Sequence, residues 1–255
     1  MTENSYAIAN GLVVNRLGYG AMRLTGQPGN FGPYPQWQDG LALVRRAADL
    51  GVTFFDSAWA YGPGHVDRLL GEALEGRDVV IATKGGVDKP EPGKIIVDGR
   101  RDALMRQIDQ SLAHLRRDRI DLFQLHRVDP QTPIEISLEA LAEAQADGRI
   151  GHIGLSNVTK AQLDRALAVA PIASVQNRFN QAEGDGDGLV DYTAAKGIAF
   201  IPYGPLGAHP MRPGATLDPQ TAIAWLLARS PNIVVIPGTT SMAHLEQNWA
   251  AWELV

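Results

Sequence analysis

The chain of 255 residues contains no cysteine, so neither a disulfide framework nor a thiolate metal site is available to it. No window approaches 18 uninterrupted apolar residues, and we therefore expect no membrane span. The N-terminus, MTENSYAIANG, lacks the basic start and the apolar stretch of a signal peptide. These absences lead us to expect a cytoplasmic protein.

An excess of positive charge is also missing, because 23 Lys and Arg residues face 28 Asp and Glu residues. The net charge of −5 argues against electrostatic binding to nucleic acid or to a membrane surface. Hydrophobic residues make up 45% and charged residues 20%, a normal balance for a globular protein. We expect a small-molecule partner, and a monomer or weak homo-oligomer.

Short apolar runs alternate with longer amphipathic segments along the whole chain. The β-like runs are residues 16–21, 53–56, 79–83, 120–125, 150–155, 173–176, 198–202 and 233–236. The helix-like segments are residues 38–50, 66–74, 101–115, 134–147, 159–168, 188–195, 218–229 and 241–249. Thr159 and Asp218 are expected N-caps. Residues 12–14, ahead of the first strand, are expected to form a small hairpin that plugs the bottom of a barrel.

Eight strand–helix units in one chain of this length predict a (β/α)₈ TIM barrel. We expect a single domain over residues 1–255 with a short C-terminal tail; a doubly wound open sheet is the structural rival. The loop EGDGDGL at residues 183–189 resembles a calcium loop only in its Asp-Gly alternation. It lacks the full ligand spacing and the closing Glu, so we expect a solvated loop and no metal site.

Four polar residues stand at or just beyond the ends of three successive apolar runs. Asp56 and Tyr61 lie in FFDSAWAYG, Lys84 in VVIATKGG and His126 in DLFQLHR. The strand ends of a barrel meet at one rim, and neighbouring strands are about 4.8 Å apart, so the four side chains could converge. Taken singly, each has an ordinary alternative as a cap, a solvated lysine or a rim histidine.

Together the four residues suit acid catalysis on a carbonyl group. Tyr61 would be the general acid, and the Lys84 ammonium would lower its pKa. Asp56 would hold Lys84, and His126 would orient the carbonyl oxygen. No side chain donates hydride, so a nicotinamide cofactor would be required.

Seven fragments in order, between about residues 14 and 248, make the chain resemble an aldo-keto reductase. They are RLGYGAM, FFDSAWAYG, IATKGG, DLFQLHR, GLSNV, SVQNRFN and VIPGTTSMAHLEQN. The resemblance implies reduction of aldehydes or ketones to alcohols, with a catalytic tetrad of Asp56, Tyr61, Lys84 and His126. The wording of NRLGYGAM and IPGTTSMAHL is similar to bacterial members linked to pyridoxal reduction.

The resemblance also implies a site for NADP(H), or less often NAD(H). Ser156, Asn157 and Gln176 would bind the carboxamide, and Tyr203 would stack on the nicotinamide. Further cofactor contacts are expected from Gly20, Met22, Asp56, Gly204, Pro205, Leu206, Gly207, Pro237, Gly238, Thr239, Thr240, Ser241, His244, Gln247 and Asn248. Residues 238–241 precede a helix, whose free N–H groups suit a phosphate, although an ordinary N-cap is the alternative.

Two departures from the family pattern bear on specificity. Between Ile236 and Asn248 there is no Lys or Arg to pair with a 2′-phosphate, and only His244 stands where an arginine is common. We expect NADP(H) to be preferred, with NAD(H) possible. The short tail predicts an open pocket for aromatic or pyridoxal-like aldehydes and a broad substrate range. Its expected lining is Tyr19, Met22, Phe31, Trp59, Tyr61 and His126.

Two other functions stay open from the sequence. Tyr192 and Lys196 form the Y-x-x-x-K pair of short-chain dehydrogenases, although Arg23 occupies the third glycine position of a G-x-G-x-x-G fingerprint. The chain could also be a non-catalytic nicotinamide-binding module.

Overall fold

The computed structural model describes residues 4–185, 187–205 and 218–255. Its strands are β1 (Ser5–Ala9), β2 (Leu12–Asn15), β3 (Tyr19–Gly20), β4 (Phe54–Asp56), β5 (Val80–Gly85), β6 (Val87–Glu91), β7 (Lys94–Val97), β8 (Ile120–Leu125), β9 (Ile150–Ser156), β10 (Ile172–Gln176) and β11 (Ala199–Phe200). Its helices are α1 (Trp37–Leu50), α2 (His65–Ala73), α3 (Arg101–Leu115), α4 (Ile134–Ala146), α5 (Lys160–Leu167), α6 (Leu189–Ala195), α7 (Pro219–Arg229) and α8 (Met242–Trp249), followed by a 3₁₀ turn (Ala250–Leu254).

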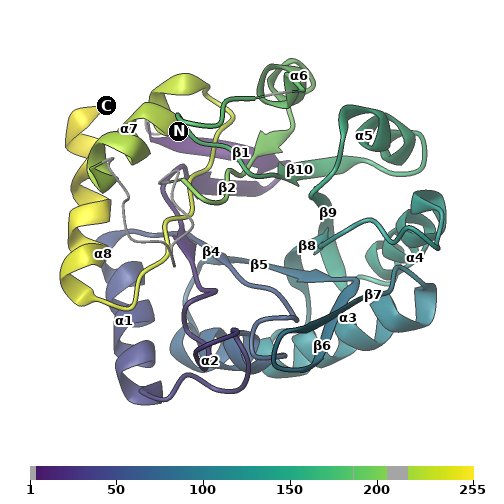
Figure 1. Ribbon diagram of the computed structural model, residues 1–255, viewed down its shortest axis with the longest axis horizontal. Coiled ribbons are helices and arrows are strands. Elements are labelled where there is room, and N and C mark those ends of the chain that lie inside the picture. Colours follow the sequence, from purple (N-terminus) through teal and green to yellow (C-terminus); the bar gives the residue numbers. More distant parts are fainter. Residues whose placement is uncertain (1–3, 186, 206–217) are drawn as a thin grey trace.

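Seven strands form one parallel sheet in the order β11-β10-β9-β8-β5-β4-β3. The segment at residues 232–236 closes this sheet, because Val235 bridges Leu17 on one side and Ile233 bridges Phe200 on the other. Gly18 N donates to Val235 O at 2.8 Å, and Val234 N donates to Phe200 O at 2.9 Å. The helices lie around the outside of the strands (Figure 1). The predicted TIM barrel is confirmed, with its eighth strand reduced to bridges.

The predicted helix ends have clear local causes. Thr159 caps α5 in a reciprocal capping box with Gln162, and Asp218 accepts a hydrogen bond from Thr221 N at the start of α7. Gly51 ends α1 in the left-handed conformation, with φ of 105°. No helix within the described ranges is long and apolar enough to cross a membrane.

The hairpin of β1 and β2 closes the bottom of the barrel, as the sequence predicted. Its buried residues Ile8, Leu12 and Val14 belong to one apolar cluster with inward-facing strand residues such as Phe54 and Leu122. The hairpin is tied to the start of the second barrel strand, because Asn15 N donates to Thr53 Oγ1 at 2.7 Å. The opposite end of the barrel is therefore left for polar groups.

A second hairpin was not predicted. Strands β6 and β7 pair in antiparallel fashion between β5 and α3, with Val87 opposite Val97. This hairpin lies beyond the carboxyl end of β5 and adds a wall to that rim of the barrel. It matters for the site because it carries Lys89.

Candidate active site

The polar layer at the top of the barrel follows from the two-residue period of its strands. On β4, Phe54 and Asp56 share the inward face, and on β8 Leu122 and Gln124 do so. The register pairs Asp56 with Ala82 and Lys84 with Gln124. Each strand thus places an apolar side chain in the core and a polar one two residues later, at the carboxyl end.

A buried ion pair lies at the centre of this layer. Lys84 Nζ donates to Asp56 Oδ2 at 2.7 Å and to the Ser57 carbonyl at 2.7 Å, and the Lys84 side chain is fully buried. Gln176 Nε2 donates to the other carboxylate oxygen of Asp56 at 2.8 Å. Burial opposes the charge on Lys84, but Asp56 and Tyr61 together outweigh it and raise the pKa of Lys84. The amine therefore stays an ammonium.

Tyr61 lies over this ion pair in the turn between β4 and α2. Lys84 Nζ is 5.3 Å from the centre of the Tyr61 ring. Burial raises the pKa of Tyr61, and the opposing effect of Lys84 is smaller. Lys84 lowers the pKa of Tyr61, as expected, but the desolvation of the phenolate has the larger effect, so the net shift is upward.

His126 follows β8 directly and stands beside Tyr61. The two ring centroids are 6.1 Å apart with an interplanar angle of 89°. Burial, together with the charges of Lys84, Arg127 and Lys89, holds the pKa of His126 well below its usual range. Its Nδ1 is buried with no hydrogen-bond partner in the described part of the chain. The imidazole is therefore neutral at pH 7.

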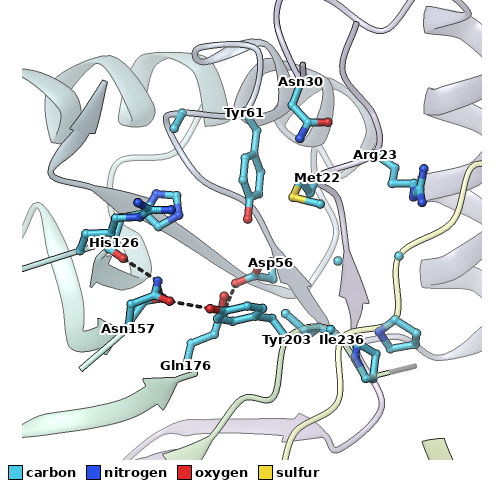
Figure 2. Close-up of a pocket in the computed structure, with 18 of the residues that line it drawn as sticks. Met22, Arg23, Asn30, Asp56, Tyr61, His126, Asn157, Gln176, Tyr203 and Ile236 are labelled. Atoms are coloured by element: carbon cyan, nitrogen blue, oxygen red, sulfur yellow. Dashed lines mark hydrogen bonds between the residues drawn. The ribbon is translucent and has the colours of Figure 1, made fainter. Parts of the chain in front are cut away.

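A cavity of about 530 Å³ opens over these groups, within the usual size range for small-molecule sites. Figure 2 shows the Tyr61 hydroxyl pointing into it, with His126 on one side and Arg23 on the other. The lining consists of Gly20, Met22, Arg23, Asn30, Asp56, Ala60, Tyr61, Lys89, His126, Arg127, Ser156, Asn157, Gln176, Tyr203, Gly204, Pro205, Ile236, Pro237, Gly238 and Asn248. Lys84 lies beneath this lining, bound to Asp56.

One wall of the cavity is a hydrogen-bonded set of predicted cofactor residues. Asn157 Oδ1 accepts from the Tyr203 hydroxyl at 2.6 Å, and Asn157 Nδ2 donates to the His126 carbonyl at 3.1 Å (Figure 2). Asn157 Nδ2 also donates to Ser156 Oγ at 3.0 Å. Asn157 has a φ of 57°, in the left-handed region that asparagine adopts more readily than most residues. The wall thus presents amide, hydroxyl and aromatic groups together.

Several predicted pocket residues lie elsewhere. Tyr19 is fully buried, and its hydroxyl donates to the Thr239 carbonyl at 2.6 Å, so it supports the wall from behind. Trp59 stacks on His114 with ring centroids 5.8 Å apart. Phe31 belongs to a turn in which its N–H donates to Gly26 O at 3.0 Å. Among the described residues that line the cavity, none of these three is present.

The cofactor contacts expected between Pro237 and Asn248 are divided in the same way. Pro237, Gly238 and Asn248 line the cavity, and Ser241 serves as the N-cap of α8. Thr239 Oγ1 accepts from Ser241 N at 3.0 Å. Thr240, His244 and Gln247 lie outside the lining formed by the described residues. Leu206 and Gly207 fall outside the described part of the chain.

Four polar lining residues were not predicted as site residues: Arg23, Asn30, Lys89 and Arg127. Arg23 and Asn30 belong to the long connection between β3 and α1, and Lys89 belongs to the unpredicted hairpin. Arg127 is the direct neighbour of His126 and could have been found from that position. The sequence indicated Lys89 less clearly. It stands two residues after Val87, so in a strand the two side chains point to the same face.

Of the alternative pair, Tyr192 lies on α6 and Lys196 is the C-cap of that helix, and both lie outside the cavity lining. The Tyr192 hydroxyl donates to Asp164 of α5, and the ammonium groups of Lys160 and Lys196 lie 4.1 Å and 4.8 Å from the centre of its ring. A closed barrel also has no Rossmann sheet. The structure therefore does not support the short-chain dehydrogenase interpretation.

Known proteins similar to this chain are oxidoreductases. Pyridoxine 4-dehydrogenase from Escherichia coli (strain K12) is 39% identical over the whole chain and 94% of its own length. An uncharacterized oxidoreductase from Schizosaccharomyces pombe is 37% identical over 93% of this chain and 81% of its own length.

Solved structures repeat the fold. A glycerol dehydrogenase from Gluconobacter oxydans superposes with a TM-score of 0.88 at 22% identity, over 99% of this chain and 91% of its own. An aldo-keto reductase from Klebsiella pneumoniae, solved in complex with NADPH, gives a TM-score of 0.80 at 25% identity, over 100% and 91%. The model of the aldo/keto reductase family matches residues 16–219. The chain therefore belongs to the aldo/keto reductase family.

Proposed function

We propose that the protein reduces aldehydes or ketones to alcohols with NADP(H), and that Asp56, Tyr61, Lys84 and His126 form its catalytic tetrad. The observation that carries this proposal is the Tyr61 hydroxyl, which faces the cavity over the buried Lys84–Asp56 pair and beside a neutral His126. The general acid, the charged pair that supports it and the group that orients the carbonyl therefore lie next to one another. The similarity to pyridoxine 4-dehydrogenase supports the same reaction class.

The residues present fit a nicotinamide cofactor. Gly20 and Gly238 line the cavity and allow their two segments to approach closely there, since a Cβ at Gly20 would lie 2.6 Å from the Ile236 carbonyl and one at Gly238 would lie 2.5 Å from the Gly20 carbonyl. Ser156, Asn157 and Gln176 would hold the carboxamide, with the Tyr203 ring beside the nicotinamide. Bound NADP(H) would supply the hydride that no side chain can donate.

Arg23 offers the positive charge that residues 236–248 lack. It lines the cavity together with Gly238, on the side away from His126 (Figure 2). A guanidinium pairs well with phosphate oxygens, so Arg23 would hold the pyrophosphate, which NADP(H) and NAD(H) share. The support for NADP(H) comes from the aldo-keto reductases of Klebsiella pneumoniae solved with NADP and with NADPH.

The proton transfer follows from the charge states of the site. Tyr61 keeps its proton at neutral pH because burial raises its pKa, and it gives that proton from Oη to the carbonyl oxygen. The Lys84 ammonium stabilises the phenolate that forms, and Asp56 keeps Lys84 charged and in place. Because Nδ1 of His126 has no acceptor, we assign its proton to Nε2, which can donate to the same carbonyl oxygen.

We propose that the substrates are bulky, aromatic aldehydes. The cofactor would take up part of the cavity of about 530 Å³, and the substrate would lie against Met22, Ala60, Tyr61 and His126. Pyridoxal-like ring aldehydes fit this description, in agreement with the name of the Escherichia coli relative. We propose a broad range of such aldehydes.

The test compares wild type, Tyr61→Phe and Tyr192→Phe in aldehyde-dependent oxidation of NADPH. Removal of the Tyr61 hydroxyl should lower kcat by about 10²–10⁴-fold, the usual contribution of a positioned general acid, while NADPH binding is retained. Tyr192→Phe serves as the matched control and should keep wild-type activity. Loss of activity in the control variant alone would overturn the assignment.

The same assay separates the other possibilities. Binding of NADPH without turnover of any aldehyde, aromatic or aliphatic, would favour the non-catalytic module. Replacing NADPH with NADH tests the cofactor, and a clearly higher kcat/KM with NADH would contradict the preference for NADP(H).

A further inference from the structure

The cavity carries more positive charge than the proposed reaction uses. Among the described residues that line it, Asp56 is the single acidic residue, and Lys84 and Gln176 already occupy its carboxylate. The basic residues of the lining are Arg23, Lys89 and Arg127. Such a cavity favours an anion. The proposed function assigns Arg23 to the cofactor phosphates, which leaves Lys89 and Arg127 to be explained.

Lys89 is unusual because its ammonium is buried without a carboxylate. The residue is 8% exposed, and Nζ donates to the backbone carbonyls of Gly29 at 3.0 Å and Asn30 at 3.1 Å. An ammonium has three donors, so these two bonds leave one for a ligand. Burial lowers the pKa of Lys89, which shows what its charge costs here. A buried lysine whose charge is not balanced by a carboxylate is an unfavourable way to hold two loops together, which suggests that Lys89 has a second role.

Arg127 adds a second cation at the same end of the cavity. It follows His126 in the chain, is exposed at the rim, and also lines the cavity. Arg127 is the chain neighbour of His126, and Lys89 is bound to the carbonyl of Asn30, which lines the same cavity as Tyr61. The charges of both cations also act on His126, whose pKa they lower. We therefore place the two cations at the carbonyl end of the cavity.

We propose that Lys89 and Arg127 form an anion subsite, which selects carbonyl substrates that carry an acidic group, a phosphate or a carboxylate. The inference rests on the proposed function and narrows its substrate class. The planar guanidinium of Arg127 would hold two oxygens of the acidic group, and the Lys89 ammonium would attract it as a point charge. The aldehyde would then face Tyr61 and His126.

The test uses a matched series of para-substituted benzaldehydes: 4-carboxybenzaldehyde, 4-formylphenyl phosphate, a neutral methyl ester and a trimethylammonium analogue. Each is reduced by wild type, Arg127→Met, Lys89→Met and Lys89→Arg. Comparing each variant with wild type on one substrate cancels differences in intrinsic aldehyde reactivity. Lys94→Met is the control, since Lys94 lies on the same hairpin but pairs with Glu91 in solvent.

We expect Arg127→Met to lower kcat/KM for the two anionic aldehydes at least 10-fold, mainly through KM, and to change the neutral ester less than 2-fold. The trimethylammonium analogue should improve. Lys89→Arg should keep more of the preference for anions than Lys89→Met, and Lys94→Met should keep all of it. If kcat/KM falls more for the phosphate than for the carboxylate, the natural acidic group is a phosphate; the reverse order identifies a carboxylate. Equal losses on anionic and neutral aldehydes would overturn the subsite.

Two further measurements keep the inference separate from the proposed function. Titration calorimetry with terephthalate, which cannot be reduced at its carboxylates by this chemistry, measures the subsite directly. Weaker binding in Arg127→Met than in wild type supports it even if no aldehyde is turned over, an outcome that would contradict the proposed function alone. Equal terephthalate binding in both proteins overturns the subsite. Because Arg127 is exposed, its variant tests the inference even if Lys89→Met fails to fold.

Discussion

Tyr61 and His126 face the same cavity, and burial shifts their pKa values in opposite directions. Burial raises the pKa of Tyr61 and lowers that of His126, because each shift favours the neutral form. The cations Lys84, Lys89 and Arg127 then lower the pKa of His126 further. At neutral pH the site therefore holds a protonated tyrosine and an uncharged imidazole over a charged lysine.

These directions predict the pH profile of kcat/KM for carbonyl reduction. The pKa of His126 is well below its usual value of about 6.5, and that of Tyr61 is above its usual value of about 10. Neither group changes charge between about pH 6.5 and 10, so the profile should be flat over that range. Steady-state rates in a constant-ionic-strength buffer series check this.

A fall in kcat/KM on the acid side with an apparent pKa near 6.5 would contradict the neutral His126. Alcohol oxidation should behave differently, because it needs the Tyr61 phenolate. Its rate should rise with pH across the same range.

The sequence was informative about the centre of the site and much less so about its walls. Asp56, Lys84 and His126 stand at strand ends, where a two-residue period and a parallel sheet dictate their direction. Arg23 and Lys89 reach the cavity through a loop and a hairpin whose placement depends on tertiary contacts, such as the bonds of Lys89 to Gly29 and Asn30. No local pattern encodes such contacts.

The β1–β2 hairpin shows how one element determines which end of the barrel can be polar. Ile8, Leu12 and Val14 close the bottom, packed on Phe54 and other inward-facing strand residues. With the bottom sealed by apolar side chains, the buried charges Asp56 and Lys84 can satisfy one another only at the top. The fold of this short hairpin is thus coupled to the site at the opposite end.

Ile8 and Val13 offer a matched pair for testing this role. Ile8 is 2% exposed inside the barrel, whereas Val13 is 48% exposed on the outer face of the same hairpin. Ile8→Ala should lower the free energy of unfolding by about 2–5 kcal/mol, because it removes buried methyl groups and leaves a cavity. Val13→Ala should change it by about 0.5 kcal/mol or less.

Urea denaturation followed by circular dichroism measures both variants. Similar losses for Ile8→Ala and Val13→Ala would mean that the hairpin does not plug the barrel but merely adds two strands to its surface.

The periodicity of apolar residues predicted the helices and strands whose buried faces are regular. Helices such as α3 and buried strands such as β8 repeat their apolar residues at a fixed spacing, and both were found. The β6–β7 hairpin was missed because Ile95 and Ile96 are exposed side by side, which breaks the alternation of a half-buried strand. The eighth strand was predicted correctly in position, but Pro237 offers no N–H to extend its ladder.

The whole barrel depends on joining its first and last segments, which are more than 200 residues apart. Arg16 makes much of this joint. Its guanidinium and Nε donate to the carbonyls of Ile233 at 3.1 Å, Leu227 at 2.5 Å and Ser230 at 2.7 Å. A second arginine, Arg46 of α1, also links the two ends of the chain, through an ion pair to Glu246 of α8 at 2.7 Å.

The two arginines should contribute very differently to stability. Arg16→Met would remove three hydrogen bonds from its guanidinium, although the Ser230 carbonyl would keep the bond from Ile233 N. Hydrogen bonds to a charged group contribute about 1.5–3 kcal/mol each before non-additivity. We expect a loss of about 2–5 kcal/mol in the free energy of unfolding.

Arg46 and Glu246 are 44% and 48% exposed, so solvent screens their pair, and Arg46→Met should lower the free energy of unfolding by about 1 kcal/mol or less. Urea midpoints at low and high salt measure both, with the small Arg46 effect shrinking further in salt. Closure of the barrel by Arg16 would be refuted if Arg16→Met were no less stable than Arg46→Met, since the joint would then rest on the strand bridges at Val235 and Ile233 alone.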